Sequence, residues 1–87
     1  MKSVWKATVE NNDIRIENNW FFGEKLYVNN KLQDYQINYI SPPKLTGHII
    51  TGNNQKKLIK VNLLQGFFTI RCVMFLDDEL VPLKKVK

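Results

Sequence analysis

The sequence predicts an all-β fold, an antiparallel β-sandwich of about eight short strands in two four-stranded meanders. Three observations predict it. Short runs of β-branched and aromatic residues alternate with polar residues, which places apolar side chains on one face of each strand. Pairs of Asn, Gly and Asp separate these runs, and such residues tolerate the positive φ of tight hairpins. No segment has the sustained spacing that an amphipathic helix of about ten residues needs.

The first half of the chain contains four expected strands, at residues 4–9, 14–16, 20–28 and 31–38. In the first, Trp5, Ala7 and Val9 share one face because successive side chains of a strand point to opposite sides. Gly23 interrupts the third strand, and a glycine inside a strand pattern indicates a bulge or bend. Asn29-Asn30 predicts a two-residue hairpin turn into the fourth strand.

The second half repeats this organisation after the breaker Pro42-Pro43, which we expect to be a connector because proline donates no ladder hydrogen bond. Its expected strands are residues 45–51, 58–63, 67–76 and 79–83, with Pro82 indicating an edge or a strand end. The register follows from Arg71, which a one-residue slip would bury. The predicted inner face is therefore Phe68, Ile70, Cys72, Met74 and Leu76, packed against Trp5, Ile14, Ile16, Trp20, Phe22, Leu26 and Val28.

The two halves resemble each other, which predicts a single domain over residues 1–87 built from pseudo-repeats at 3–38 and 45–83. The run 14–16 matches 59–61, and the run 27–32 matches 75–80. The offset between matched positions grows along the chain, so each step requires only a small insertion in a turn. The alternative is that alternating β sequences match one another easily without a common origin.

Composition places the chain among small globular proteins. With 87 residues and 44% apolar content it can build one core, and it is too hydrophobic for a disordered segment. The single Cys72 allows no internal disulfide, which favours the reducing cytoplasm. We expect no signal peptide and no membrane span, because no apolar run is long enough. The net charge of +5 is expected to reflect a solvated surface and a frayed basic tail, Lys84, Lys85 and Lys87.

Segments across most of the chain resemble a set of short, uncharacterised bacterial all-β proteins, namely residues 19–28, 59–61 and 67–80. The repeated strand-hairpin pattern, Leu-Tyr-Val-Asn-Asn at 26–30 and Met-Phe-Leu-Asp-Asp at 74–78, is more distantly similar to the β-sandwich of Fas apoptotic inhibitory molecule. That family often carries Asp-Gly at these turns. The resemblance implies an antiparallel sandwich and a non-enzymatic, protein-binding role, with no catalytic residues to transfer.

The residues capable of chemistry are few and scattered, so we expect no enzyme, no cofactor and no metal site. The single His48 is expected to be an ordinary edge-strand or surface histidine rather than a catalytic base or ligand. Cys72 shares its predicted face with Ile70 and Met74, which favours a core thiol over a reactive one activated by Arg71. The acidic run 77–79 is expected to form a turn, since a Ca²⁺ site needs six to eight oxygen ligands.

Cations and aromatic residues are predicted to gather on the side of the strands opposite the core. This candidate interaction face consists of Lys6, Arg15, Tyr27, Lys60, Phe67, Arg71 and Phe75. Aromatic residues and Arg are enriched where proteins bind proteins, which favours a protein partner or a homodimer, through this face or an edge strand. The alternative is single-stranded nucleic acid, which stacks its bases on aromatic side chains above a basic surface.

Overall fold

A computed structural model describes residues 2–19, 23–37, 44–65 and 70–87, which form nine β-strands and no helix. They are arranged in two antiparallel sheets, so the predicted all-β sandwich is confirmed. Sheet A has the order β4-β3-β2-β1-β9 and sheet B the order β5-β6-β7-β8. The strands are β1 (Lys2–Val9), β2 (Asn12–Asn19), β3 (Gly23–Val28), β4 (Lys31–Gln36), β5 (Lys44–Ile50), β6 (Lys56–Gln65), β7 (Ile70–Leu76), β8 (Glu79–Val81) and β9 (Lys84–Lys85).

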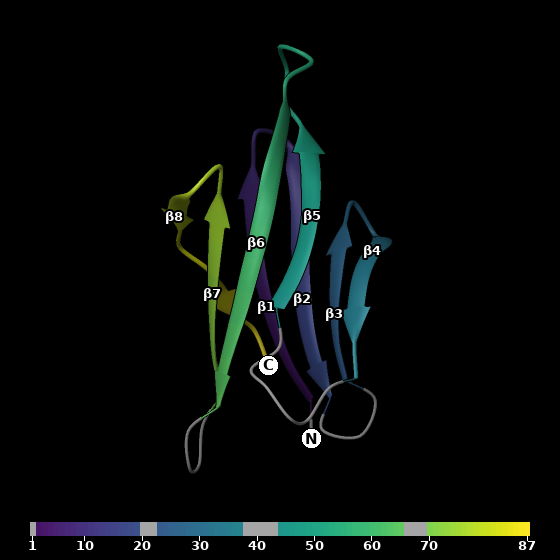
Figure 1. The fold of residues 1–87 in the computed structure, drawn as a ribbon, viewed down its shortest axis with the longest axis vertical. Coiled ribbons are helices and arrows are strands. Elements are labelled where there is room, and N and C mark those ends of the chain that lie inside the picture. The colour runs from purple at the N-terminus through teal and green to yellow at the C-terminus, as the bar shows by residue number, and fades with distance from the viewer. Residues whose placement is uncertain (1, 20–22, 38–43, 66–69) are drawn as a thin grey trace.

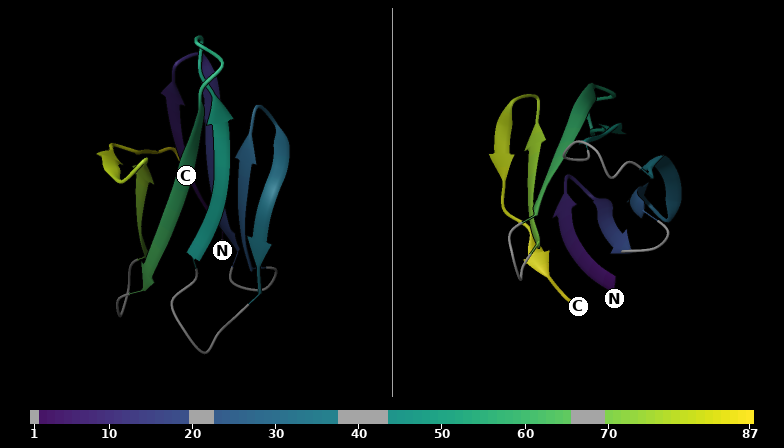
Figure 2. Two further views of the ribbon diagram at one scale, coloured as in Figure 1. Left: turned by 45° about the horizontal axis from the view of Figure 1, so that its top comes forward. Right: turned by 60° about the horizontal axis from the view of Figure 1, so that its bottom comes forward.

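Each half of the chain forms one meander, and the two meanders face each other, with sheet B in front of sheet A in Figure 1. After β8 the chain leaves sheet B, and the C-terminal strand β9 pairs with β1 at the edge of sheet A (Figure 2). The expectation of a frayed tail is therefore wrong. Val86 N donates to Val4 O at 2.8 Å and Val4 N donates to Lys87 O at 3.3 Å, because the free backbone groups of an edge strand accept a further strand.

Three hairpin turns have the mirror-image geometry that matches the right-handed twist of paired strands. Both central residues have positive φ in each turn, which Asn and Asp tolerate better than most residues. The three pairs are Glu10 and Asn11 (48° and 66°), Asn29 and Asn30 (52° and 64°), and Asp77 and Asp78 (47° and 67°). The turns predicted at Asn29-Asn30 and Asp77-Asp78 are confirmed, and the turn predicted at residues 10–12 ends one residue early because Asn12 enters β2. The pair Asn18-Asn19 also predicts a turn, and this prediction is wrong because both residues lie within β2.

The core lies between the two sheets and follows the predicted register. Its buried members are Trp5, Ile14, Ile16, Leu26, Val28, Leu45, Ile49, Ile59, Val61, Leu63, Met74 and Leu76. Ile70 and Cys72 pack against this cluster while Arg71 is exposed, so the predicted inward face of β7 is confirmed where it is described. Trp20, Phe22, Phe68 and the connector Pro42-Pro43 lie outside the described residues.

The bend predicted at Gly23 takes a different form. Gly23 opens β3 with φ of 89°, and a Cβ there would collide with the backbone oxygen of Gln36 on the neighbouring strand. The glycine is thus needed for its backbone conformation and for the close approach of β4. The shift in register occurs later: Leu26 pairs with Asp34 and Tyr27 with Leu32, so Gln33 is the extra residue of a bulge in β4.

Residues at and beside the bulge in β4 contact the neighbouring edge strand of the other sheet. Side-chain oxygens of β4 accept hydrogen bonds from three alternate backbone N–H groups of β5. The pairs are Gln36 Oε1 with Lys44 N at 3.1 Å, Asp34 Oδ2 with Thr46 N at 2.8 Å, and Gln33 Oε1 with His48 N at 2.8 Å. An edge strand normally exposes such groups to solvent or to another chain. Here the side chains of one sheet cap the edge of the other.

Asn12 makes a second polar link between the sheets. Its side chain is 8% exposed, and Nδ2 donates to Glu10 O at 3.1 Å and to Ile50 O at the end of β5 at 3.0 Å. Asn12 Oδ1 accepts a bond from Asn29 Nδ2 at 2.9 Å. A buried amide is tolerated when its donors and acceptor are paired, so Asn12 is a structural residue that joins two hairpin turns to sheet B.

Replacing Gly47 should test the contact between the sheets at this capped edge. A Cβ at Gly47 would collide with Gln33 Oε1, which holds His48 N, and would lie 2.9 Å from Leu26 Cδ2. We expect Gly47→Ala to lower the free energy of unfolding by about 1–3 kcal/mol. Gly52→Ala is the matched control, because nothing lies within 4 Å of its added Cβ. Urea denaturation of both variants measures the difference, and equal stabilities would contradict the packing described.

Candidate functional site

The residues of the predicted interaction face do not form one surface. Lys6, Arg15 and Tyr27 lie on the outer face of sheet A, on neighbouring strands β1, β2 and β3. The remaining described members, Lys60, Arg71 and Phe75, lie on the outer face of sheet B. Phe67 lies outside the described residues. The register separates the two groups because both sheets turn their other faces toward the shared core.

On sheet A the predicted residues belong to a single row across five strands, Lys84, Lys6, Arg15, Tyr27 and Leu32. The Arg15 guanidinium is already engaged within the chain. Arg15 Nε lies 2.9 Å from Glu17 Oε2, and Nη1 donates to Asn30 Oδ1 at 2.9 Å. Its Cζ also lies 4.3 Å from the centre of the Tyr27 ring, a cation–π contact. These partners hold Arg15 in place on the sheet.

Sheet B carries a corresponding row of Thr46, Lys60, Phe75 and Leu80. Lys60 Nζ lies 3.3 Å from Asp78 Oδ1, and both side chains are well exposed, at 50% and 84%. An exposed ion pair of this kind contributes about 0–1 kcal/mol, so Lys60 remains free to exchange partners. Lys60 is therefore more available than Arg15 at the matching position.

The hairpin turns that follow β3 and β7 also have the same hydrogen-bonding pattern. Asn29 N donates to Asp13 O at 2.8 Å, and Asp13 N donates to Asn29 Oδ1 at 2.9 Å. In the second half, Asp77 N donates to Leu58 O at 2.9 Å, and Leu58 N donates to Asp77 Oδ1 at 2.8 Å. The first turn residue thus caps the neighbouring strand in both halves. This repetition is what an internal duplication would leave, and the duplication stays a prediction.

The outer face of sheet B also presents an apolar surface that the sequence analysis did not single out. Ile50, Leu58 and Leu80 are 49%, 45% and 65% exposed, and Phe75 is half-buried between them. The strand pairing makes these residues neighbours. Phe75 pairs directly with Leu80, and Ile50, Leu58 and Phe75 are diagonal neighbours on successive strands. Diagonal neighbours lie about 7–8 Å apart, within reach of large side chains. We call these four residues the apolar stripe.

A signal for part of the stripe was present in the sequence. If Ile59, Val61 and Leu63 point inward, then Leu58 must point outward by the period of two. Leu80 could not be placed in the same way, because its orientation depends on pairing opposite Phe75 across the turn. Ile49 and Ile50 are adjacent, and only the pairing with β6 shows that Ile49 is the buried one.

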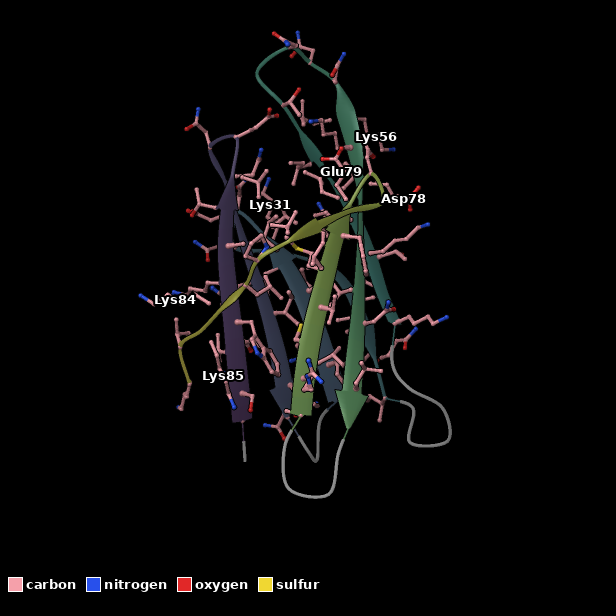
Figure 3. All side chains as sticks on the ribbon, turned by 90° about the vertical axis from the view of Figure 1, so that its left-hand side faces the viewer. Lys31, Lys56, Asp78, Glu79, Lys84 and Lys85 are labelled. Carbon is pink, nitrogen blue, oxygen red and sulfur yellow. The ribbon has the colours of Figure 1, made fainter. Side chains whose placement is uncertain are left out.

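The basic residues beside the stripe complete the face. Lys44, Lys56, Lys60 and Arg71 are all exposed and point outward from sheet B. No Asp or Glu occurs among the described outward-facing strand residues of this sheet. Acidic side chains occur instead at the margin, where Figure 3 shows Asp78 and Glu79 at the turn after β7. The outer face of sheet B is therefore apolar and basic at the same time.

The residues with potential for catalysis do not come together. His48 lies exposed on the outer face of β5, whereas Cys72 packs against the core from the inner face of β7. The predicted core position of Cys72 is confirmed, and burial raises the pKa of its thiol from 9.0 to about 12. Among the described residues, no three His, Cys, Asp or Glu side chains cluster closely enough to hold a metal ion.

An open groove of about 620 Å³ runs beside the connection from β8 to β9. It is lined by Lys6, Ala7, Thr8, Val81, Pro82, Leu83, Lys84 and Val86. These lining residues include no carboxylate, imidazole or thiol, so the groove has apolar walls with two ammonium groups and one hydroxyl. Such a composition supports contact with a ligand surface and supplies no acid, base or nucleophile of matched pKa. We therefore do not place the candidate site there.

Among the residues that the structure describes, the one buried carboxylate belongs to Glu24, which is 7% exposed on β3. Burial raises its pKa above the ordinary value of 4.5, and a hydrogen bond from Asn18 Nδ2 at 2.7 Å partly opposes the shift. Asn18 is 3% exposed, and its Oδ1 has no hydrogen-bond partner. A protonated Glu24 would supply the O–H donor that Asn18 Oδ1 lacks. The pair is thus better satisfied when Glu24 is neutral.

Comparison of the chain with protein-family models, with curated proteins and with solved structures found no match. The described residues contain no helix that is long and apolar enough to cross a membrane.

The partly buried thiol of Cys72 should resist alkylation and disulfide exchange in the folded protein. The thiolate is the reactive form, and a pKa of about 12 leaves very little of it at pH 8. We expect a disulfide reagent such as dithiobis(nitrobenzoate) to react about a hundredfold or more slowly with native protein than with protein in urea. Equal rates in the two conditions would show that Cys72 is accessible and that its placement in the core is wrong.

Removing the charge of Glu24 should change how stability depends on pH. Because its folded pKa lies above 4.5, the folded state retains a proton that the unfolded chain releases, and stability falls as pH rises from 4.5 through the raised pKa. Glu24→Gln should abolish this fall and at pH 7 raise the free energy of unfolding by about 0.5–1.5 kcal/mol, through a new bond to Asn18 Oδ1.

Urea denaturation at pH 4 and at pH 7 measures the effect of Glu24→Gln. Glu79→Gln removes the same charge from an exposed position and should change stability by less than about 0.5 kcal/mol at either pH. A Glu24→Gln protein that is less stable than the parent at pH 7 would mean that the ionised carboxylate is the favoured form in the fold.

Proposed function

We propose that this chain is a non-catalytic protein-interaction module of the cytoplasm that docks its partner on the outer face of sheet B. The apolar stripe carries this proposal. Isolated hydrophobic residues on a surface are ordinary, but contiguous exposed ones indicate an interaction site. Leu80 and Leu58 are the most informative members, because both large side chains stand about half exposed next to the aromatic ring of Phe75.

A sheet face is favoured over a sheet edge as the docking surface. At β5 the alternate N–H groups of Lys44, Thr46 and His48 already donate to side chains of β4. At β1 the C-terminal strand β9 covers part of the edge. The free edge of sheet B is β8, which has three residues and is followed by Pro82. Strand addition needs a longer row of free backbone groups than these edges offer.

The separation of reactive groups supports a role without catalysis. Nucleophilic catalysis requires a nucleophile and a base within about 3 Å of each other. His48 and Cys72 lie on opposite faces of sheet B, and the thiol of Cys72 is held protonated by burial. Glu24 is buried against Asn18 on the inner side of sheet A. A binding role makes use of none of these groups.

Single-stranded nucleic acid receives less support as a ligand. The proposed stacking residues and cations are divided between two sheets, so Arg15 with Tyr27 and Lys60 with Phe75 cannot bind one short strand together. Arg15 is also held by Glu17, Asn30 and the Tyr27 ring, which compete with phosphate for the guanidinium. A basic face still permits weak, salt-sensitive attraction, so an oligonucleotide titration at low salt is the relevant control.

Photo-crosslinking in the cells that produce the protein tests the proposed face. Benzoylphenylalanine at position 58 or 80 should give discrete adducts with protein, because both side chains lie on the apolar stripe. Position 32 is the matched control: Leu32 is 52% exposed at the corresponding place in the row of sheet A. Adducts of twice the chain mass would identify self-association. Adducts equally strong at position 32, or none at 58 and 80, would exclude the outer face of sheet B.

A further inference from the structure

We infer that the partner bound by the outer face of sheet B is an acidic, amphipathic helix, an inference that rests on the proposed function. Two features of this face specify the chemistry of such a partner. The apolar stripe of Ile50, Leu58, Phe75 and Leu80 requires a continuous row of apolar side chains. The cations beside it require carboxylates, because a partner with its own cations would be repelled.

Three of the four cations lie on one flank of the stripe, whereas Lys56 lies on the other side of it, opposite Ile50. Lys60 pairs with Thr46 and with Phe75. Lys44 pairs with Asn62, two residues further along β6. Arg71 pairs with Leu64, two residues further again. All three side chains are exposed, and the one ion pair that they make with the described residues is the solvent-exposed contact of Lys60 with Asp78. Binding a carboxylate here would require little desolvation of existing partners. The flank therefore complements a row of acidic residues.

The charge balance of the other outer face makes this flank distinctive. On sheet A, Glu17 lies 3.2 Å from Lys2 and 2.9 Å from Arg15, so these two cations are paired with a carboxylate on the same face. On sheet B the described outward strand positions include no carboxylate. The asymmetry arises between halves that otherwise share rows, turns and strand order. It assigns the acidic partner to sheet B rather than to both faces.

The length of the stripe fits a helix laid across the strands. The stripe crosses four strands that are spaced by about 4.8 Å, and from Ile50 to Leu80 it also advances by four residues along the strands. Together these displacements give a length of about 20 Å along the diagonal. A helix of about 13 residues spans the same length. Its apolar residues at spacings of three and four would form a row over the stripe, and acidic residues on one side of this row would meet Lys60.

A second copy of the chain is a poorer occupant. Placing two sheet B faces against each other would bring the Lys44, Lys60 and Arg71 flank of one copy near the same basic surface of the other. The acids available to offset this charge, Asp77, Asp78 and Glu79, are confined to one turn, where Asp77 caps Leu58 N and Asp78 contacts Lys60. An acidic helix brings complementary charge over the whole flank.

Fluorescent model peptides provide a direct test with the full chain. The acidic peptide has about 18 residues, with Leu at helical spacing, Glu on the flanking positions and Ala elsewhere. One comparison peptide replaces every Glu with Lys, and another scrambles the acidic sequence so that the Leu spacing is lost. We expect anisotropy titrations to show at least tenfold tighter binding of the acidic peptide than of either comparison peptide. Affinity should fall as salt is raised.

Variants of exposed residues connect this binding to the face. Leu58→Glu combined with Leu80→Glu should abolish binding of the acidic peptide, and Lys60→Glu should weaken it at least threefold. Leu32→Glu makes the same chemical change at the matching position of sheet A and should leave the affinity unchanged. Thermal denaturation verifies that each variant is folded before titration. If Leu32→Glu alone abolished binding, the peptide would bind sheet A, and the inference would be overturned.

Several outcomes would overturn the acidic-helix inference. They are equal or tighter binding of the basic or scrambled peptide, no binding of any peptide, and dimerisation that Leu80→Glu abolishes. Binding to phosphatidylserine vesicles that the acidic peptide cannot displace would make an anionic membrane the occupant instead. Crosslinks at positions 58 and 80 without preference for the acidic peptide would overturn this inference and leave the proposed protein-binding role in place. If neither the crosslinks nor a preference for the acidic peptide is observed, the inference and the proposed function are both wrong.

Discussion

The capped edge of β5 is the constraint on which the rest of the structure depends. Gln33, Asp34 and Gln36 on β4 accept hydrogen bonds from alternate N–H groups of β5, so the two sheets are joined along one side by side chains rather than by a strand pair. Unpaired backbone donors in a partly closed site cost free energy and invite pairing with other chains. The caps remove both problems. They also agree with the pairing of β5 with β6, which places Ile49 in the core and turns Ile50 outward.

The opposite side of the sandwich is closed by the chain itself. From β8 the chain passes through Pro82 and Leu83 to β9, which pairs with β1 and so transfers the C-terminus from sheet B to sheet A. Lys85 Nζ then lies 6.0 Å from the centre of the Trp5 ring, which adds a contact between the C-terminal segment and the core. With both sides occupied in this way, the broad free surfaces of the described structure are its two outer sheet faces.

Those two faces are alike in backbone and different in chemistry. Both present a row in which a cation, an aromatic ring and an exposed leucine follow one another: Arg15, Tyr27 and Leu32 in sheet A, Lys60, Phe75 and Leu80 in sheet B. In sheet A the cation is held by Glu17, Asn30 and the ring beneath it. In sheet B it is exposed, and no acidic residue occupies a described outward strand position of that face. The same local geometry thus holds the central cation of sheet A against several partners and leaves that of sheet B in one solvent-exposed ion pair.

The amino-acid sequence by itself determined the fold class, the two meanders, the hairpin turns and the inward register of β7. These features depend on local rules: alternation sets which side chains share a face, Asn and Asp permit positive φ, and burying Arg71 would be too costly. The sequence could also place Arg15, Tyr27, Lys60 and Phe75 on outward positions, because outward and inward are a matter of parity along one strand. Whether outward residues from different strands form one surface is a matter of which sheet each strand joins. Only the tertiary structure decided that these four residues lie on two faces, that the basic tail becomes β9, and that Gln33 rather than Gly23 is the bulged residue. These outcomes depend on pairing between segments distant in the chain, where the gain comes from backbone groups and side chains that no local pattern identifies as neighbours.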